Sequence, residues 1–173
     1  MPGQHPDSQM LERFMRNEAG AQERRAVVLH LLTGCAQCVA VTRRLWRLGE
    51  EPLKPPRKAR RGERPALSDP EATERVWREA MQEAMRAGLA REAARALLEL
   101  ALLYVRQGRA ADLQRLAEEL RPICYLPGVG MSVTSALLFF RRLVETGFAT
   151  QDVLSEVALF LGDLPKAQRA TWK

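Results

Sequence analysis

The stretch His30-Leu-Leu-Thr-Gly-Cys35-Ala-Gln-Cys38 constrains the fold more than any other part of the chain. It places one of the two histidines and two of the three cysteines within nine residues. An imidazole followed by a Cys-x-x-Cys pair is a set of ligands that commonly holds zinc. The spacing therefore indicates three metal ligands, and the fourth must come from elsewhere in the chain. The alternative is two buried thiols beside an imidazole at a helix end.

The backbone signals around this stretch suit a metal site. A helical period of apolar residues predicts a helix over 21–33 that carries His30 near its end: Val27, Val28, Leu31 and Leu32. Gly34 can take the left-handed conformation that lets the chain turn back. Cys35 and Cys38 then share one face of the first turn of the next helix, three positions apart. A helix N-terminus also favours the thiolate, which is the form that binds metal.

The N-terminal part of the chain is predicted to hold three short helices. Ser8 can cap the first, whose apolar side chains share one face, and residues 35–48 form the third. Fewer than 50 residues in such helices bury too little apolar surface to fold securely alone. A structural zinc ion can contribute about 10–16 kcal/mol to folding. The sequence therefore predicts a small metal-held unit over 1–48.

Residues 5–38 resemble the zinc-binding anti-sigma-factor domain. The resemblance rests on His5-Pro-Asp-Ser, on Glu23-Arg-Arg-Ala-Val-Val-Leu-His30, and on the Cys35–Cys38 pair. It implies that His5, which lies 25 positions before His30, is the fourth ligand of a structural Zn²⁺ ion. Four residues separate His30 from Cys35, where three are usual in the family. Some members release the metal when their thiols are oxidised, so a redox switch is an alternative to a purely structural ion.

Residues 49–69 are predicted to be a linker, because repeated proline and glycine exclude a helix. The linker contains a basic run over 54–64 whose one acidic residue is Glu63: Lys54, Arg57, Lys58, Arg60, Arg61 and Arg64. Such a run could neutralise the phosphates of a nucleic acid. No aromatic residue is interleaved to stack on bases. The alternative is a solvated linker that contacts an acidic protein surface.

The rest of the chain is predicted to be helical hairpins over 70–162, followed by a tail over 163–173. Ser68-Asp69-Pro70-Glu71 is a strong helix start. Apolar periodicity and intervening glycines predict helices over 70–87, 90–107, 110–123, 132–146 and 150–161. The first is expected to pack through Val76, Trp77, Ala80, Met81 and Ala84. The fold class is therefore all-α, with antiparallel helices.

The segment Leu100-Ala-Leu-Leu-Tyr104-Val-Arg-Gln-Gly108, followed by spaced apolar residues to Leu120, resembles a tetratricopeptide repeat. The resemblance implies helical hairpins that stack into a short solenoid. One 34-residue period further on, the position of Gly108 is taken by Arg142, so the second unit is degenerate.

Other features exclude several classes of function. Both histidines belong to the metal site and no other catalytic constellation is visible, so we expect neither an enzyme nor a small-molecule substrate. Gly128-Val-Gly130 is interpreted as a hairpin connection because no strand precedes it, and Cys124 as a small buried hydrophobic residue. No apolar run is long enough to span a membrane, and the cysteines do not form a disulfide framework. We expect a soluble, cytoplasmic protein.

The sequence favours a non-enzymatic regulatory or adaptor protein. Its metal-held unit and helical repeats would bind a protein partner, which the anti-sigma resemblance implies is a sigma factor in transcription regulation. One alternative is a nucleic-acid-binding protein that uses the basic run over 54–64. Another is a subunit of a larger assembly, in which the metal only completes the fold.

Overall fold

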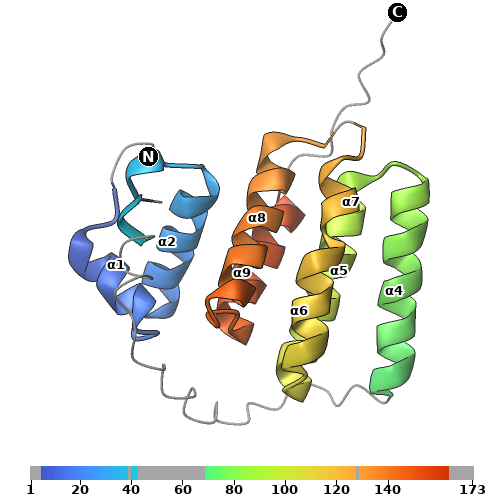
Figure 1. Cartoon of the computed structure of the whole chain (residues 1–173). Coiled ribbons are helices and arrows are strands. Elements are labelled where there is room, and N and C mark those ends of the chain that lie inside the picture. The colour runs from blue at the N-terminus through green and yellow to red at the C-terminus, as the bar shows by residue number, and fades with distance from the viewer. Residues whose placement is uncertain (1–4, 39, 43–68, 128, 164–173) are drawn as a thin grey trace, which may run out of the picture.

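The computed structural model describes residues 5–38, 40–42, 69–127 and 129–163. These residues form helices and no strand, which confirms the predicted all-α class (Figure 1). The helices are α1 (Ser8–Met15), α2 (Ala21–Leu32), α4 (Pro70–Arg86), α5 (Ala90–Gln107), α6 (Ala110–Glu119), α7 (Arg121–Cys124), α8 (Met131–Glu145) and α9 (Gln151–Asp163). Residues 36–38 and 40–42 are also helical.

Helix α5 is the centre of the larger part of the fold. It packs against α4, α6, α7, α8 and α9, and 11 of its 18 residues are buried. Several of these are alanines, which let the neighbouring helices approach closely. Its last residue is followed by Gly108 in the left-handed conformation, at φ 70°. That glycine ends the helix as the sequence predicts.

The start of α4 follows the sequence signal, whereas α1 is capped by Asp7 and not by the predicted Ser8, and another predicted helix is broken. Asp69 caps α4, where its Oδ1 accepts the N–H groups of Glu71 and Ala72 at 3.0 and 3.1 Å. The helix predicted over 110–123 instead ends at Glu119, and the short α7 follows. Pro122 lies in α7 and has no N–H to continue the ladder of hydrogen bonds, which accounts for the break.

The prediction for one side of α4 was wrong. Val76 is 58% exposed, although Met81 and Ala84 are buried and Trp77 is half-buried. Helix α4 packs mainly on α5 and lies at the outside of the fold (Figure 1). A helix that contacts one neighbour buries only a narrow stripe, and Val76 lies beside that stripe.

Helices α1 and α2 do not stand apart from the rest of the described fold. Helix α2 packs on α8 and α9, and the ring centroids of Phe14 and Phe148 lie 5.9 Å apart. One hydrophobic core includes buried residues of α1 and α2 together with those of α5, α8 and α9. The division into units over 1–48 and 70–162 stays a prediction, because the linker lies outside the described residues apart from Asp69.

The tetratricopeptide-like arrangement is not confirmed. Helices α4 and α5 form an antiparallel hairpin, but α5 also packs extensively on α9 at the end of the described chain. A solenoid brings each repeat into contact with its neighbours only, so this contact gives the helices a more compact, bundle-like arrangement. Among the described residues, no single helix has the length and apolar character of a membrane span. By these two criteria alone, one bent pair passes: Ala21–Leu32 with Ala36–Thr42, at 109°.

Candidate metal centre

The structure brings together the four residues that the sequence analysis singled out as metal ligands. One ligand atom from each of His5, His30, Cys35 and Cys38 lies within 4.8 Å of the others. The Nδ1 atom of His5 is 3.5 Å from the Sγ atoms of both cysteines. Zn–N and Zn–S bonds of about 2.0–2.3 Å in a tetrahedron place the ligand atoms about 3.3–3.8 Å apart. The distances from His5 to the two sulfurs fall in this range.

A tight turn joins His30 to the two cysteines. His30 lies in the last turn of α2, and the C-cap residue Thr33 donates its hydroxyl to the carbonyl of His30 at 2.6 Å. Gly34 follows at φ 76°, a conformation that side chains with a Cβ rarely adopt. The chain then bends by 109° between Ala21–Leu32 and Ala36–Thr42. This bend turns the sulfurs of Cys35 and Cys38 toward the imidazole.

His5 is held in place by the start of α1. It lies two residues before Asp7, whose side chain caps that helix by accepting the N–H of Met10 at 2.6 Å. The rings of His5 and His30 are 5.1 Å apart and nearly perpendicular, at 72°. The N-terminal residue that composition alone would assign to a frayed end is therefore part of the cluster.

An ion pair ties α1 to α2 and so supports the position of His5. Arg13 of α1 donates to Glu23 of α2 at 2.6 Å, in the two-point geometry that arginine and carboxylate favour. The buried Leu11 and Phe14 anchor the other side of α1 in the core. Helix α2, which supplies His30, and helix α1, which follows His5, are thus fixed to each other.

The environment of His30 suits a metal ligand. Its Nε2 atom is buried and has no hydrogen-bond partner among the described residues. A buried polar atom without a partner costs about 1–3 kcal/mol, and a metal bond at this nitrogen would remove that cost. Burial, followed by the nearby His5, lowers the pKa of His30. The imidazole is therefore kept neutral, which is the form that binds a metal.

The two thiols lie in different environments. The backbone N–H of Cys38 points at the sulfur of Cys35 and lowers the pKa of that thiol, with the N–H of Gln37 acting in the same sense. Burial raises the pKa of Cys38, which is only 3% exposed. A bound cation would favour the thiolate at both positions, because a coordinating thiol is deprotonated outright. Two imidazoles and two thiolates are a donor set that fits a tetrahedral metal ion, so these four residues fit the zinc ion that the resemblance implies.

The other candidate sites have different outcomes. The basic residues of the run over 54–64 lie outside the described residues, so their binding role stays a prediction. Cys124 packs against the core but is only half-buried, so the predicted small buried hydrophobic residue is found only in part, and burial raises the pKa of its thiol. Gly130 precedes α8 at its N-terminal cap and connects it to α7, although Gly128 is outside the described residues.

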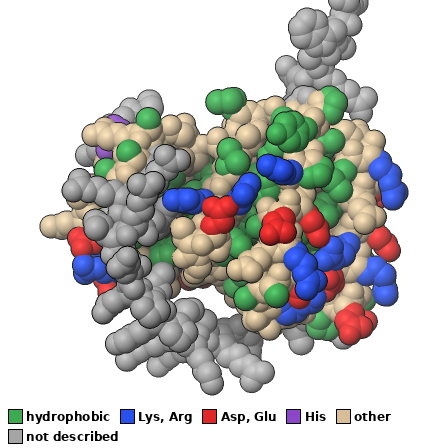
Figure 2. All heavy atoms as spheres, in the orientation of Figure 1, with side chains coloured by type: hydrophobic (Ala, Val, Ile, Leu, Met, Phe, Trp, Pro, Cys, Tyr) green, Lys and Arg blue, Asp and Glu red, His purple; other side chains and the backbone are tan. Residues whose placement is uncertain are grey.

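A second polar cluster was missed by the sequence analysis. Glu74 of α4 accepts hydrogen bonds from Tyr104 at 2.6 Å, from Arg78 at 3.2 Å and from Arg109 at 2.6 Å. Arg109 also bonds Asp112 at 2.7 Å, and its guanidinium lies 4.6 Å from the centre of the Tyr104 ring. We call these five residues the ion network. Figure 2 shows that opposite charges lie side by side over this part of the visible face.

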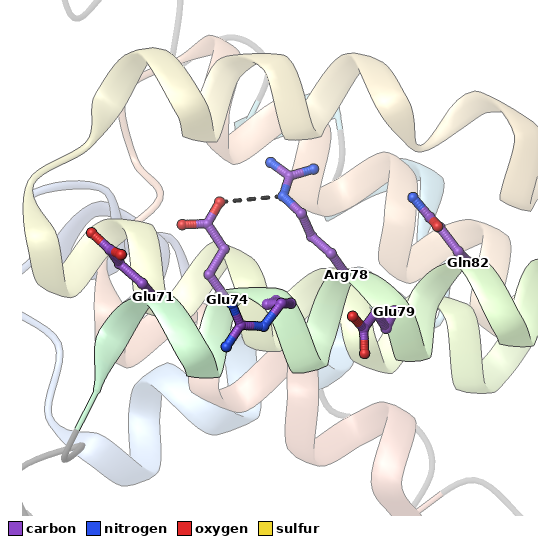
Figure 3. A pocket seen from close by; sticks show the side chains of 6 residues that line it. Glu71, Glu74, Arg78, Glu79 and Gln82 are labelled. Carbon is purple, nitrogen blue, oxygen red and sulfur yellow. Dashed lines mark hydrogen bonds and ion pairs between the residues drawn. The ribbon is translucent and has the colours of Figure 1, made fainter.

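Two residues of the ion network also line a surface depression. A shallow pocket runs along α4, and Figure 3 shows Glu74 and Arg78 pointing toward each other from that helix. Burial acts to raise the pKa of Glu74, but the hydrogen bonds from Tyr104, Arg109 and Arg78 outweigh it and lower the pKa to about 2. Burial and the Glu74 carboxylate raise the pKa of Tyr104 to about 12. The i,i+4 spacing of Glu74 and Arg78 was a visible signal for part of this network.

No protein-family model matches this chain, and no curated protein or solved structure matches it either. The class that the described fold and site define is an all-α protein with a His₂Cys₂ cluster that could hold a metal ion. Any function must therefore be argued from the cluster and from the surfaces of the helices around it.

Proposed function

We propose that this chain is a non-enzymatic regulatory or adaptor protein whose N-terminal helices are held by a structural Zn²⁺ ion. The ligands are His5, His30, Cys35 and Cys38. The protein uses its helical surfaces to bind a protein partner, and the resemblance of residues 5–38 to anti-sigma-factor domains makes a sigma factor the first candidate. The observation that carries the proposal is the convergence of the four ligand atoms within 4.8 Å.

Zinc is favoured by the chemistry of the donor set. Thiolate and imidazole together are borderline-to-soft ligands, whereas Mg²⁺ and Ca²⁺ prefer carboxylate and carbonyl oxygens. Four protein ligands also leave no open position for substrate or water, which is typical of a structural rather than a catalytic zinc site. Such an ion stabilises short helices but does not itself perform chemistry.

A binding role is supported by exposed apolar side chains. Leu29 and Val41 lie on either side of the stretch from His30 to Cys38 in sequence and are 36% and 37% exposed. Tyr125 and Met131, on either side of the connection between α7 and α8, are 84% and 86% exposed. Aromatic residues and methionine are enriched where proteins contact one another. The surface next to the metal cluster and the surface at the α7–α8 connection therefore both suit a partner.

The metal assignment is tested by zinc analysis of the purified protein and of matched cysteine variants. We expect one zinc per chain, retained in Cys124→Ser and lost in Cys35→Ser and Cys38→Ser. His5→Ala and His30→Ala should each weaken zinc retention against a competing chelator. Zinc content unchanged in Cys35→Ser would refute the ligand assignment.

The partner is tested by co-purification of the zinc-loaded protein with individual sigma factors. A sigma factor should be recovered with the zinc-loaded protein and with Cys124→Ser, but not with Cys35→Ser. Recovery that is the same for both serine variants would mean that the metal-held unit is not the binding element. Recovery of no sigma factor by the loaded protein would count against anti-sigma action and leave the zinc assignment intact.

A further inference from the structure

Helix α2 takes part in two structures at once. At its C-terminal end His30 faces the metal cluster, with its Nε2 buried and without a hydrogen-bond partner among the described residues. Along its length Val27 and Val28 are fully buried in the core that α2 shares with α8 and α9. A change in the position of α2 would therefore affect both the metal cluster and the packing on α9.

Further contacts fasten the N-terminal helices to the C-terminal pair. The ring of Phe14 in α1 lies 5.9 Å from that of Phe148, which connects α8 to α9. Arg24 of α2 has a side chain only 17% exposed, and its Nη1 lies 3.5 Å from the carboxylate of Asp152 in the first turn of α9. The Nε atom of Arg24 is buried without a hydrogen-bond partner among the described residues, which adds no stability to this contact.

Helix α9 depends on α2 for part of its cover. It packs on α5 and α8, and it also packs on α2. The apolar side chains of α9 are buried at four positions: Val153, Leu154, Val157 and Leu161. If α2 moved away, the part of α9 that α2 covers would meet water. Exposing apolar surface to water is unfavourable, so a state in which α2 has moved away from α9 is disfavoured.

The N-terminal helices have little intrinsic stability to hold them there. Helix α1 has 8 residues and α2 has 12, and isolated helices of such lengths are marginal in water. The four residues of the metal cluster come from the chain before α1, from α2, from the turn after it and from the helical residues 36–38. An ion bound by all four would fix these segments relative to one another.

We propose that metal binding and the docking of α1 and α2 on α8 and α9 are thermodynamically coupled, so that loss of the metal uncovers one side of α9. The inference rests on the proposed zinc site and extends it to the stability of the contact between α2 and α9. Because coupling between two equilibria is reciprocal, contacts between α2 and α9 must also raise the affinity for the metal. Metal binding at the cluster thus stabilises the contact between α2 and α9.

The direct test is hydrogen exchange of the full chain with one equivalent of zinc and after chelation. We expect amide exchange in α2 and α9 to accelerate about tenfold or more on zinc removal, within the usual range of coupling. Exchange in α4 is the internal control and should stay within error. Zinc content is measured on the same samples.

The reciprocal test measures zinc affinity in variants of the contact. Phe148→Leu and Arg24→Ala should each lower the affinity for zinc about fivefold or more, in competition with a chromophoric chelator. Leu116→Val in α6 and Glu145→Ala at the exposed end of α8 are the controls, with affinity like that of the parent. Circular dichroism confirms which variants are folded, and Arg24→Ala removes the ion pair with Asp152 without changing an apolar residue of the core.

The outcomes separate this inference from the proposed function. Zinc-dependent exchange in α9 together with weaker binding in both contact variants supports the coupling. A protein that binds one zinc through the cluster but shows no change in α9 overturns the coupling and leaves the zinc site standing. A protein that binds no zinc overturns both proposals.

Discussion

The two polar clusters of this molecule fasten helices in different ways. The metal cluster joins the segment before α1, α2, the following turn and the helical residues 36–38 through four side chains whose ligand atoms lie within 4.8 Å. The ion network joins α4, α5 and α6 through charges that already neutralise one another, with Glu74 accepting three hydrogen bonds. In the metal cluster the buried Nε2 atom of His30 has no hydrogen-bond partner in the described structure. In the ion network both carboxylate oxygens of Glu74 accept hydrogen bonds.

This difference indicates which part of the fold can respond to its surroundings. The ion network is complete in the chain itself, so no solute is required to form it. The metal cluster is complete only when an ion is supplied, and its stability then depends on the free concentration of that ion. We therefore expect the region around α1 and α2 to be fully stable only when the ion is bound, and we call it the conditional region. The region around α4 and α5 is expected to be stable without an added ion, and we call it the constitutive region.

Removing the metal should give the largest effect and should confine it to the conditional region. Chelation, or Cys35→Ser combined with Cys38→Ser, is expected to cost several kcal/mol, a fraction of the roughly 10–16 kcal/mol measured for zinc-dependent peptides. Thermal unfolding followed by circular dichroism should show an earlier loss of part of the helical signal. If the double variant unfolds thermally in the same way as the zinc-loaded parent, the proposed contrast between the two regions is wrong.

Acid should separate the two clusters because they bind protons over different ranges. The folded-state pKa of Glu74 is lowered from 4.5 to about 2, so the unfolded chain binds more protons between these values. The stabilisation by Glu74 is present above about pH 4.5 and is lost as the pH falls toward 2, up to about 3 kcal/mol. The metal cluster should fail at milder acidity, since protons compete with the ion for imidazole and thiolate.

The measurement is a pair of pH titrations on one sample. Zinc release is followed with a chromophoric indicator, and urea unfolding is measured at each pH with Glu74→Gln as the control for the carboxylate. The contrast fails if zinc release and the Glu74-dependent loss of stability occur over the same pH range.

Removing the centre of the ion network should destabilise the constitutive region without touching the metal. Glu74→Ala leaves the guanidinium groups of Arg78 and Arg109 without their shared partner. Their side chains are 38% and 37% exposed, so water can solvate them in part, and the expected cost is about 2 kcal/mol. Urea unfolding measures it, and Glu79→Ala on the exposed side of α4 is the matched control. A lower zinc affinity in Glu74→Ala would mean that the two clusters are energetically coupled, which contradicts the contrast between them.

A pair of glycines offers the finest test. Gly34 and Gly108 have φ angles of 76° and 70°, and neither has an atom within 4 Å of the place of an added Cβ. Alanine at either position therefore costs about 1 kcal/mol in backbone strain alone. Only Gly34→Ala should also weaken zinc binding, because Gly34 directs the chain into Cys35. Equal zinc affinities in the two variants would show that this turn does not set the geometry of the cluster.

Local signals in the sequence predicted much of this structure. The all-α class, the cap and proline at Asp69 and Pro70, and the stop at Gly108 follow from short-range rules that depend on neighbouring residues. The grouping of His30, Cys35 and Cys38 follows from their spacing in the same way. The addition of His5, 25 positions earlier, came from resemblance to a family rather than from local rules.

Contacts between residues far apart in the chain were harder to predict from the sequence. Periodicity identifies the apolar side of α2 but not the helix that covers it, so the packing on α9 was not predicted. The partners of Glu74 lie 30 and 35 positions away at Tyr104 and Arg109, and charges at such distances resemble ordinary surface residues in a sequence. Val76 was placed in the buried stripe because the width of that stripe depends on how many helices pack against α4.

The central claim is that His5, His30, Cys35 and Cys38 bind one zinc ion. X-ray absorption at the zinc edge, on protein loaded with one equivalent, measures the ligands directly. The account predicts two sulfur and two nitrogen neighbours at about 2.3 and 2.0 Å, unchanged in Cys124→Ser. A zinc ion surrounded by oxygen ligands, or one whose sulfur neighbours persist when Cys35 and Cys38 are both serine, would contradict it.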